Sequence, residues 1–142
     1  MEYQKRKDTY VVRLDRGEEV MECLERLCET EGIELAQVSA IAAADEAVIG
    51  LYQVETREFH KAELKGEMEV ISLLGNVTRK DGKPYLHLHI SLGMPDMTVR
   101  GGHLSRCRIS GTCEMFVRVV DGKLGRKMDD ATGLNVFSFG EE

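Results

Sequence analysis

The stretch "EMEVISLLGNVTRKDGKPYLHLHISLG", residues 67–93, decides the fold of this 142-residue chain. Its first part alternates apolar and polar residues and then becomes apolar on both faces over residues 71–74, a pattern typical of a central strand covered on both sides. The Asp81-Gly82 pair favours a tight turn. The run that follows, "YLHLHISLG" at residues 85–93, has the two-residue period of a strand. We therefore expect two neighbouring strands joined by a turn.

One helix and several further strands are predicted around this pair. "DRGEEVMECLERLCETEGI", residues 15–33, predicts a helix with Asp15 as N-cap and Gly32 at its end. Strands are expected over residues 9–17, 34–44, 46–54, 57–64, 106–124 and 134–142, the last at a sheet edge, and a loop with a short strand over 94–104. One main helix beside a mainly antiparallel sheet makes an α+β fold. The length fits a single domain, residues 1–142.

Composition limits the classes of function. With 19 Lys and Arg against 25 Asp and Glu, the net charge is −6. Such acidity argues against strong autonomous DNA binding, because affinity comes largely from cations that release counterions from phosphates. The candidates for a local basic patch are Arg100, Arg106, Arg108 and the run Lys5 to Lys7.

No apolar run reaches the roughly 20 residues of a membrane helix, and the charged N-terminus lacks a signal segment. We therefore expect a cytoplasmic protein without membrane contact. The four cysteines contain no C-x-x-C pair, so in a reducing compartment they are expected to be small buried apolar residues.

Two of the four histidines lie one residue apart in the second strand. Residues i and i+2 of a strand share a face, so His87 and His89 point the same way with Cα atoms roughly 6.5–7 Å apart. His103, which follows Gly101 and Gly102 on a loop, is the candidate third ligand. Three imidazoles suit a divalent transition metal, zinc first, with nickel, iron and copper also compatible. Packed histidines, or solvated histidines on an open sheet face, are the alternatives.

Glu114 is the candidate catalytic residue, because it interrupts an apolar strand and could serve a metal site as acid or base. The alternative is a solvated strand face on which Glu114 pairs with an arginine. His60 lies in a charged stretch and is expected at the surface. No phosphate-binding loop, dinucleotide fingerprint or nucleophile motif appears in the sequence, so no reaction can be named.

Four motifs in order, "EVISLLGNVT", "PYLHLHISLG", "VRGGHL" and "CEMFV", resemble the plant and prokaryote conserved (PPC) domain, also called domain of unknown function 296. The resemblance extends over nearly the whole chain. The sequence looks like the stand-alone prokaryotic form, whose members are described as predicted DNA-binding proteins with a PD1-like motif. This resemblance implies an α+β fold, with a mainly antiparallel sheet flanked by a helix, that assembles as a homotrimer.

The resemblance also implies roles for particular residues. Gly75 and Asn76 match the family's Gly-Asn pair, and the three candidate histidines match those that look like a metal site in prokaryotic members. Glu114 and Arg126 match a recurrent acid and a recurrent basic residue. Ala42 stands where relatives often have glycine, a departure that affects local packing.

Plant members of this family carry AT-hooks, short Arg-Gly-Arg-Pro arms that enter the minor groove of A·T-rich DNA. This sequence has no Arg-Pro step, since Pro84 and Pro95 follow Lys83 and Met94. The resemblance therefore implies a domain for oligomerisation and partner binding, with no hook of its own.

Three functions are consistent with the sequence. We favour a trimeric metal-binding module with a DNA-associated regulatory role and no turnover. The alternative is a metal-dependent enzyme of unknown reaction, in which the three histidines hold a Lewis-acid metal and Glu114 is the acid or base. The third is direct DNA binding by the basic residues, which predicts an affinity that falls steeply with salt. The acidity of the chain counts against the third.

Overall fold

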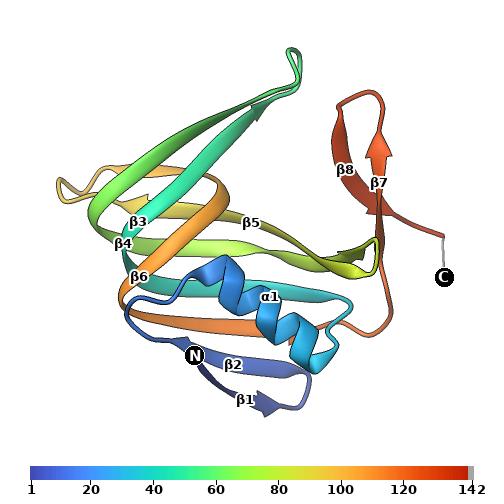
Figure 1. Cartoon of the computed structure of the whole chain (residues 1–142), viewed down its shortest axis with the longest axis horizontal. Helices are drawn as coiled ribbons and strands as arrows, with labels where there is room; N and C mark the ends of the chain where they lie inside the picture. Colours follow the sequence, from blue (N-terminus) through green and yellow to red (C-terminus); the bar gives the residue numbers. More distant parts are fainter. Residues whose placement is uncertain (141–142) are drawn as a thin grey trace.

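Eight strands and one helix make up residues 1–140, the part of the chain that the computed structural model describes (Figure 1). In chain order they are β1 (Glu2–Arg6), β2 (Thr9–Leu14), α1 (Val20–Glu31), β3 (Ala36–Gln53), β4 (Glu58–Lys80), β5 (Lys83–Gly93), β6 (Val99–Val119), β7 (Gly125–Asp129) and β8 (Leu134–Ser138). The predicted α+β class, with a mainly antiparallel sheet and one helix, is confirmed. No helix in the described part is long and apolar enough to cross a membrane.

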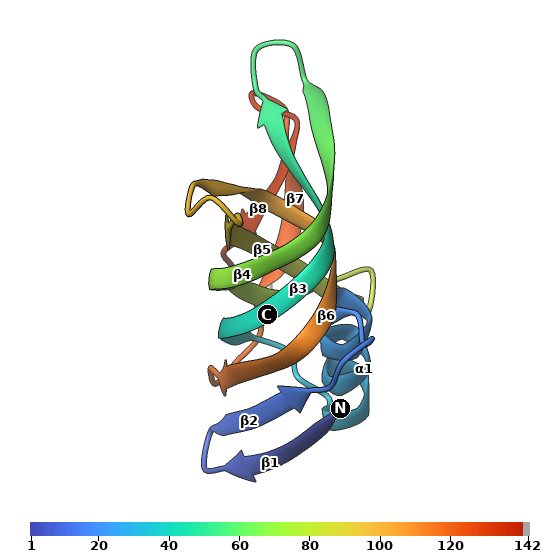
Figure 2. The same ribbon diagram turned by 90° about the vertical axis from the view of Figure 1, so that its left-hand side faces the viewer.

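Six strands form one antiparallel sheet in the order β1-β2-β6-β3-β4-β5, and β5 also pairs with β6. Strands β3, β4, β5 and β6 therefore form a closed ring, with β2 and β1 added beside β6 (Figure 2). Register shifts in β3 between Ala40 and Ala42, and between Ala44 and Glu46, mark irregularities of the kind that bends a strand. Each long strand of the ring, β3, β4 and β6, joins segments that the sequence predicted to be separate.

Helix α1 begins one turn later than predicted. Its N-cap is Glu19, not Asp15. One oxygen of Glu19 accepts a hydrogen bond from the N–H of Glu22 at 2.8 Å, and the other accepts from the buried N–H of Cys107 in β6, also at 2.8 Å. The Glu19 side chain, which is longer than that of Asp, thus accepts hydrogen bonds from the N-terminus of the helix and from strand β6 at the same time. The predicted end at Gly32 is confirmed, with a left-handed φ of 62°.

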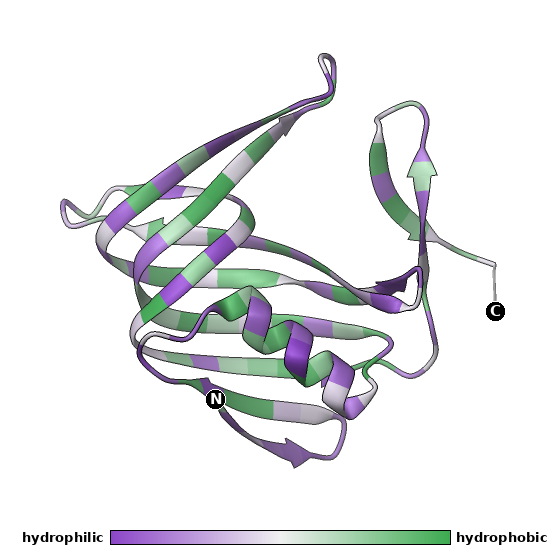
Figure 3. Cartoon of the chain, viewed as in Figure 1, coloured by the Kyte–Doolittle hydropathy of each residue, from purple (hydrophilic) through white to green (hydrophobic). Residues whose placement is uncertain are grey.

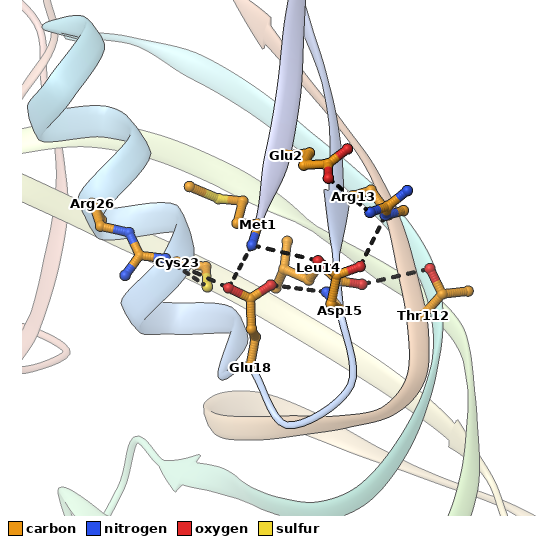
Figure 4. A network of polar contacts seen from close by, with 9 residues as sticks. All are labelled: Met1, Glu2, Arg13, Leu14, Asp15, Glu18, Cys23, Arg26 and Thr112. Carbon is orange, nitrogen blue, oxygen red and sulfur yellow. Dashed lines mark hydrogen bonds and ion pairs between the residues drawn. The ribbon is translucent and has the colours of Figure 1, made fainter.

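A polar network connects the start of β1 to the start of α1 (Figure 4). The Met1 amino group donates to Oε1 of Glu18 at 2.6 Å, while Oε2 of Glu18 accepts from the N–H of Asp15 at 2.8 Å. Arg26 of α1 lies 3.7 Å from the same Oε1. Burial alone would raise the pKa of Glu18, but the amine and the backbone N–H bind the carboxylate and lower its pKa. The network therefore fixes the outer strand β1 against the helix.

The two faces of the sheet differ in burial. Apolar and polar residues alternate along the strands (Figure 3), and those that point inward, such as Leu73, form one core with α1. On the outward face Ile41, Ile71, Leu74 and Phe116 are 52–58% exposed. The prediction that residues 71–74 are covered on both faces is therefore wrong for a single chain, because its one helix covers only one side. The four cysteines are free and buried, as predicted.

The C-terminal hairpin β7–β8 forms a separate two-stranded sheet. The predicted edge strand over residues 134–142 therefore does not join the main sheet, and Glu141 and Glu142 lie outside the described residues. Arg126 of β7 holds the hairpin on the ring. Its Nη2 donates to Oδ1 of Asn76 at 2.6 Å, and its guanidinium carbon lies 4.8 Å from the Tyr85 ring centroid and 4.4 Å from that of Phe137.

Candidate metal centre

Three histidines meet on the outward face of the ring, as the sequence predicted. His87 and His89 come from β5, and His103 of β6 is paired directly opposite His89. One ligand nitrogen of each ring lies within 4.8 Å of those of the other two, and the ring centroids are 5.2–5.7 Å apart. A tetrahedral ion at 2.0–2.1 Å from each nitrogen would hold these atoms ~3.3 Å apart.

His103 lies within strand β6, not on the predicted loop. The two glycines before it explain why, since an added Cβ at Gly102 would lie 2.5 Å from the carbonyl oxygen of Gly50. At Gly101 it would lie 2.6 Å from the carbonyl oxygen of Ile90. The pair therefore lets β6 run close between β3 and β5.

Gly75 of β4 allows a similar close approach behind His87 and His89. A Cβ at this position would overlap the carbonyl oxygen of His87 and would lie 2.7 Å from Cδ2 of Leu88. The absence of a side chain at Gly75 therefore sets how closely β5, and with it His87 and His89, approaches β4.

The surroundings of His87 and His103 favour the neutral imidazole that a metal requires. Burial, followed by the nearby charges of His103 and His89, lowers the pKa of His87 to about 4. Burial also lowers the pKa of His103. These two rings are therefore neutral at pH 7, with a lone pair free for an ion, and three nitrogen donors leave a fourth coordination position open. The donor set fits a divalent transition metal.

Two cationic side chains, Lys61 and Arg126, lie near the histidines, each separated from them by one other residue. The Phe59 ring meets His103 edge-on at 5.6 Å, and Lys61 Nζ lies 5.6 Å from the centroid of Phe59. On the other side, Asn76 is paired opposite His87 and accepts the hydrogen bond from Arg126. Asn76 and Arg126, far apart in sequence, are thus hydrogen-bonded to each other beside His87.

A pocket of about 550 Å³ opens over the three histidines. Its walls come from the β3–β4 hairpin and from β8, which the sequence did not connect with the site. The tips of the two hairpins are joined, because Tyr52 Oη donates to the carbonyl of Thr132 at 2.8 Å and Arg57 donates to that of Asp130 at 2.5 Å. Asn135 of β8 lines the pocket, and its Oδ1 is buried without a hydrogen-bond partner in the described residues.

The structure does not bring every candidate residue to this site. Glu114 is exposed on the outward face of β6, where it is paired with Arg13 and Ile41 and lines a different hollow of about 660 Å³ beside β1. His60 is exposed and hydrogen-bonds Gln53 instead, as expected for a surface residue.

The basic residues do not form one patch within the described chain. Arg108 is engaged with Asp45 at 2.8 Å and with Glu46 at 3.0 Å. The run Lys5 to Lys7 lies at the β1–β2 turn, whereas Arg100 follows the β5–β6 turn on the far side of the molecule (Figure 1).

Comparison with known proteins adds a family model and several solved structures. The model of the Plants and Prokaryotes Conserved (PCC) domain matches residues 1–121. A metal-containing protein of Archaeoglobus fulgidus is 40% identical, with a TM-score of 0.88 over 96% of this chain and 96% of that one. A plant- and prokaryote-conserved protein of Pyrococcus horikoshii is 34% identical, with a TM-score of 0.85 over 99% and 96%.

A protein of Bacteroides thetaiotaomicron that has been proposed to bind DNA is 27% identical, with a TM-score of 0.94 over 97% of this chain and 96% of that one. No curated protein matches significantly.

Proposed function

The chain belongs to the Plants and Prokaryotes Conserved (PCC) domain family, and from that premise we propose that it is a trimeric metal-binding module with a DNA-associated regulatory role. The observation that carries the proposal is the convergence of three histidines, two of them with lowered pKa, on one point of the sheet. The similarity to a metal-containing archaeal protein supports it. Zinc is the metal we expect first, since three imidazoles and an open position are a common zinc arrangement.

Trimer formation is supported by the outward face of the sheet. Strand pairing aligns Val11, Phe116, Ser39, Leu74 and His89 in one row across five strands. Three apolar side chains of this row are 40–54% exposed in the single chain. A contiguous exposed apolar surface of this kind is typical of an interaction site. A second copy that covers this row would reach the metal ligand His89, which puts the metal at the subunit boundary.

The DNA-associated part of the proposal rests on the family and on relatives proposed to bind DNA. The net charge of −6 and the engaged Arg108 argue for contact through an assembled surface or a partner protein. Direct binding by this chain would instead give an affinity that falls about as a power of the salt concentration, which a mobility-shift titration at several salt concentrations would measure.

The pocket over the histidines favours one second candidate, a metal-dependent enzyme. An open coordination position can polarise a substrate or activate water. Glu114 does not line the pocket over the histidines of its own chain. If Glu114 acts as the acid or base, it must therefore reach that pocket from a neighbouring subunit.

The first test is metal content by plasma mass spectrometry on untagged protein. We expect close to one zinc per chain in the wild type and none in the H87A/H89A variant, whereas the exposed H60A variant should match the wild type. Absence of metal in the wild type after incubation with zinc, nickel and iron would overturn both the module and the enzyme.

The trimer is tested on the same samples by light scattering coupled to size exclusion. The mass should be that of three 16.0-kDa chains. Phe116→Glu should dissociate the trimer, while Met97→Glu, at a loop residue that is 85% exposed, should not. A wild-type monomer would contradict the assembly.

A further inference from the structure

The pocket over the histidines has apolar walls around a polar floor. Leu51, Val54, Phe59 and Leu134 line it, and each is 37–64% exposed in the chain. Its volume of about 550 Å³ falls within the range of about 300–1,000 Å³ typical of small-molecule sites. A ligand with an apolar body that covers these rings and methyl groups removes apolar surface from water, which stabilises the complex.

The described lining of the pocket carries no acidic side chain, unlike the surface of an acidic protein in general. Among the described residues, none of those that line it is Asp or Glu, although the chain has a net charge of −6. A divalent ion held by one nitrogen of each imidazole would keep its full charge, because the ligands are not anions. Lys61 lies against Phe59, and Arg126 is hydrogen-bonded to Asn76, so both cations are one residue away from the histidines. A metal ion in a pocket whose described lining offers no acidic counter-ion favours an anionic ligand.

Asn135 favours a ligand that also carries a hydrogen-bond donor. Its backbone oxygen accepts from Arg126 at 3.1 Å, which fixes the residue at the pocket wall. Among the described residues its side-chain Oδ1 is buried without a partner, and an unpaired buried acceptor costs free energy that a ligand donor recovers. A hydroxyl group beside the anionic head would supply that donor.

Resting on the proposed metal site, we propose that this pocket binds a small organic carboxylate with an apolar body and a hydroxyl group next to the carboxylate. The carboxylate takes the open coordination position, the hydroxyl donates to Oδ1 of Asn135, and the apolar body lies between the two hairpins. The 2-hydroxy acids with an aromatic or branched side chain are the class with these three features.

Calorimetric titration of zinc-loaded protein with four matched probes tests the proposal. Mandelate has all three features, phenylacetate lacks the hydroxyl, benzyl alcohol lacks the carboxylate, and acetate lacks the apolar body. We expect mandelate to bind about tenfold more tightly than phenylacetate, the ratio that one hydrogen bond of about 1.4 kcal/mol gives. Acetate should bind at least tenfold more weakly than phenylacetate, and benzyl alcohol should not bind measurably.

Asn135→Ala separates the hydrogen bond from chelation of the metal by the hydroxyl. The variant should retain zinc and phenylacetate affinity but lose the preference for mandelate. In cobalt-loaded protein, the two aromatic carboxylates should change the visible absorption of the ion, and benzyl alcohol should not.

The outcomes distinguish this inference from the proposed function. Failure to take up zinc overturns both. Zinc uptake without binding of either aromatic carboxylate, or with benzyl alcohol bound as tightly as phenylacetate, overturns the ligand class alone. A preference for mandelate that persists in Asn135→Ala overturns the role of Asn135.

Discussion

Replacement of Gly75 by alanine should damage the fold and the metal centre together. The added Cβ would overlap the carbonyl oxygen of His87, a backbone atom that can move only if β5 separates from β4. Overpacking costs about 1–3 kcal/mol, and each ladder hydrogen bond lost costs about 1 kcal/mol more. With two bonds disturbed, we expect a loss of about 3–5 kcal/mol, a large part of the roughly 5–15 kcal/mol of a typical domain.

The same displacement moves the ligands on β5, so zinc affinity should fall by about 10–100-fold. Urea unfolding followed by circular dichroism measures the first effect, and competition with a chromophoric chelator measures the second. Gly125→Ala is the matched control, because a Cβ there meets nothing within 4 Å and its φ is not positive. A Gly75→Ala protein that unfolds within 1 kcal/mol of the wild type and binds zinc equally would refute the close-approach argument.

Three further predictions concern pH, the helix terminus and the thiols. The pKa of His87 is lowered from 6.5 to about 4, so the unfolded chain binds the proton more tightly. In metal-free protein, the contribution of His87 to the free energy of unfolding should therefore be fully present above pH 6.5. It should fall by roughly 1–2 kcal/mol as the pH drops to 4, after discounting for the half-exposed ring. Urea unfolding at pH 7.5 and pH 4.5 measures this difference, and most of it should be absent from the His87→Asn variant. Glu19→Ala should cost about 2–4 kcal/mol, since it removes the cap and leaves the N–H of Cys107 unpaired, whereas thermal or urea unfolding of Glu22→Ala should differ from the wild type by well under 1 kcal/mol. Ellman's reagent should detect no fast-reacting thiol in native protein and four in urea, because all are buried and burial raises the pKa of three to about 12: Cys28, Cys107 and Cys113.

The prediction that His87 and His89 lie on one face succeeded because its signal is local, whereas the strand position of His103 was not predicted. The two-residue period places His87 and His89 on one face whatever the rest of the chain does. The prediction of separate shorter strands in place of each long strand was wrong for a non-local reason. Asp45 reads as a break between two strands, yet it stays within β3 because Arg108, 63 residues later, donates to its carboxylate at 2.8 Å. No pattern along the chain reports such a cross-strand partner.

The pocket could not be predicted for the same reason. Its walls depend on contacts between residues far apart in sequence, such as Tyr52 with Thr132 and Asn76 with Arg126. The β7–β8 hairpin that carries Asn135 has the composition of an ordinary edge strand, and its docking through Arg126 and through the contacts of Tyr52 and Arg57 places Asn135 in the lining of the pocket. The candidate ligands could therefore be predicted from sequence, whereas the pocket around them could not.

The position of His89 connects the two halves of the proposed function. It lies opposite Leu74 on one side and opposite His103 on the other, so one residue borders both the exposed apolar row and the metal centre. A subunit that covers Leu74 would restrict the His89 ring, and a metal that binds His89 would order the edge of the same surface. Linkage requires that these effects be reciprocal: if the outward face is the trimer interface, the metal stabilises the assembly by the same free energy by which the assembly strengthens metal binding.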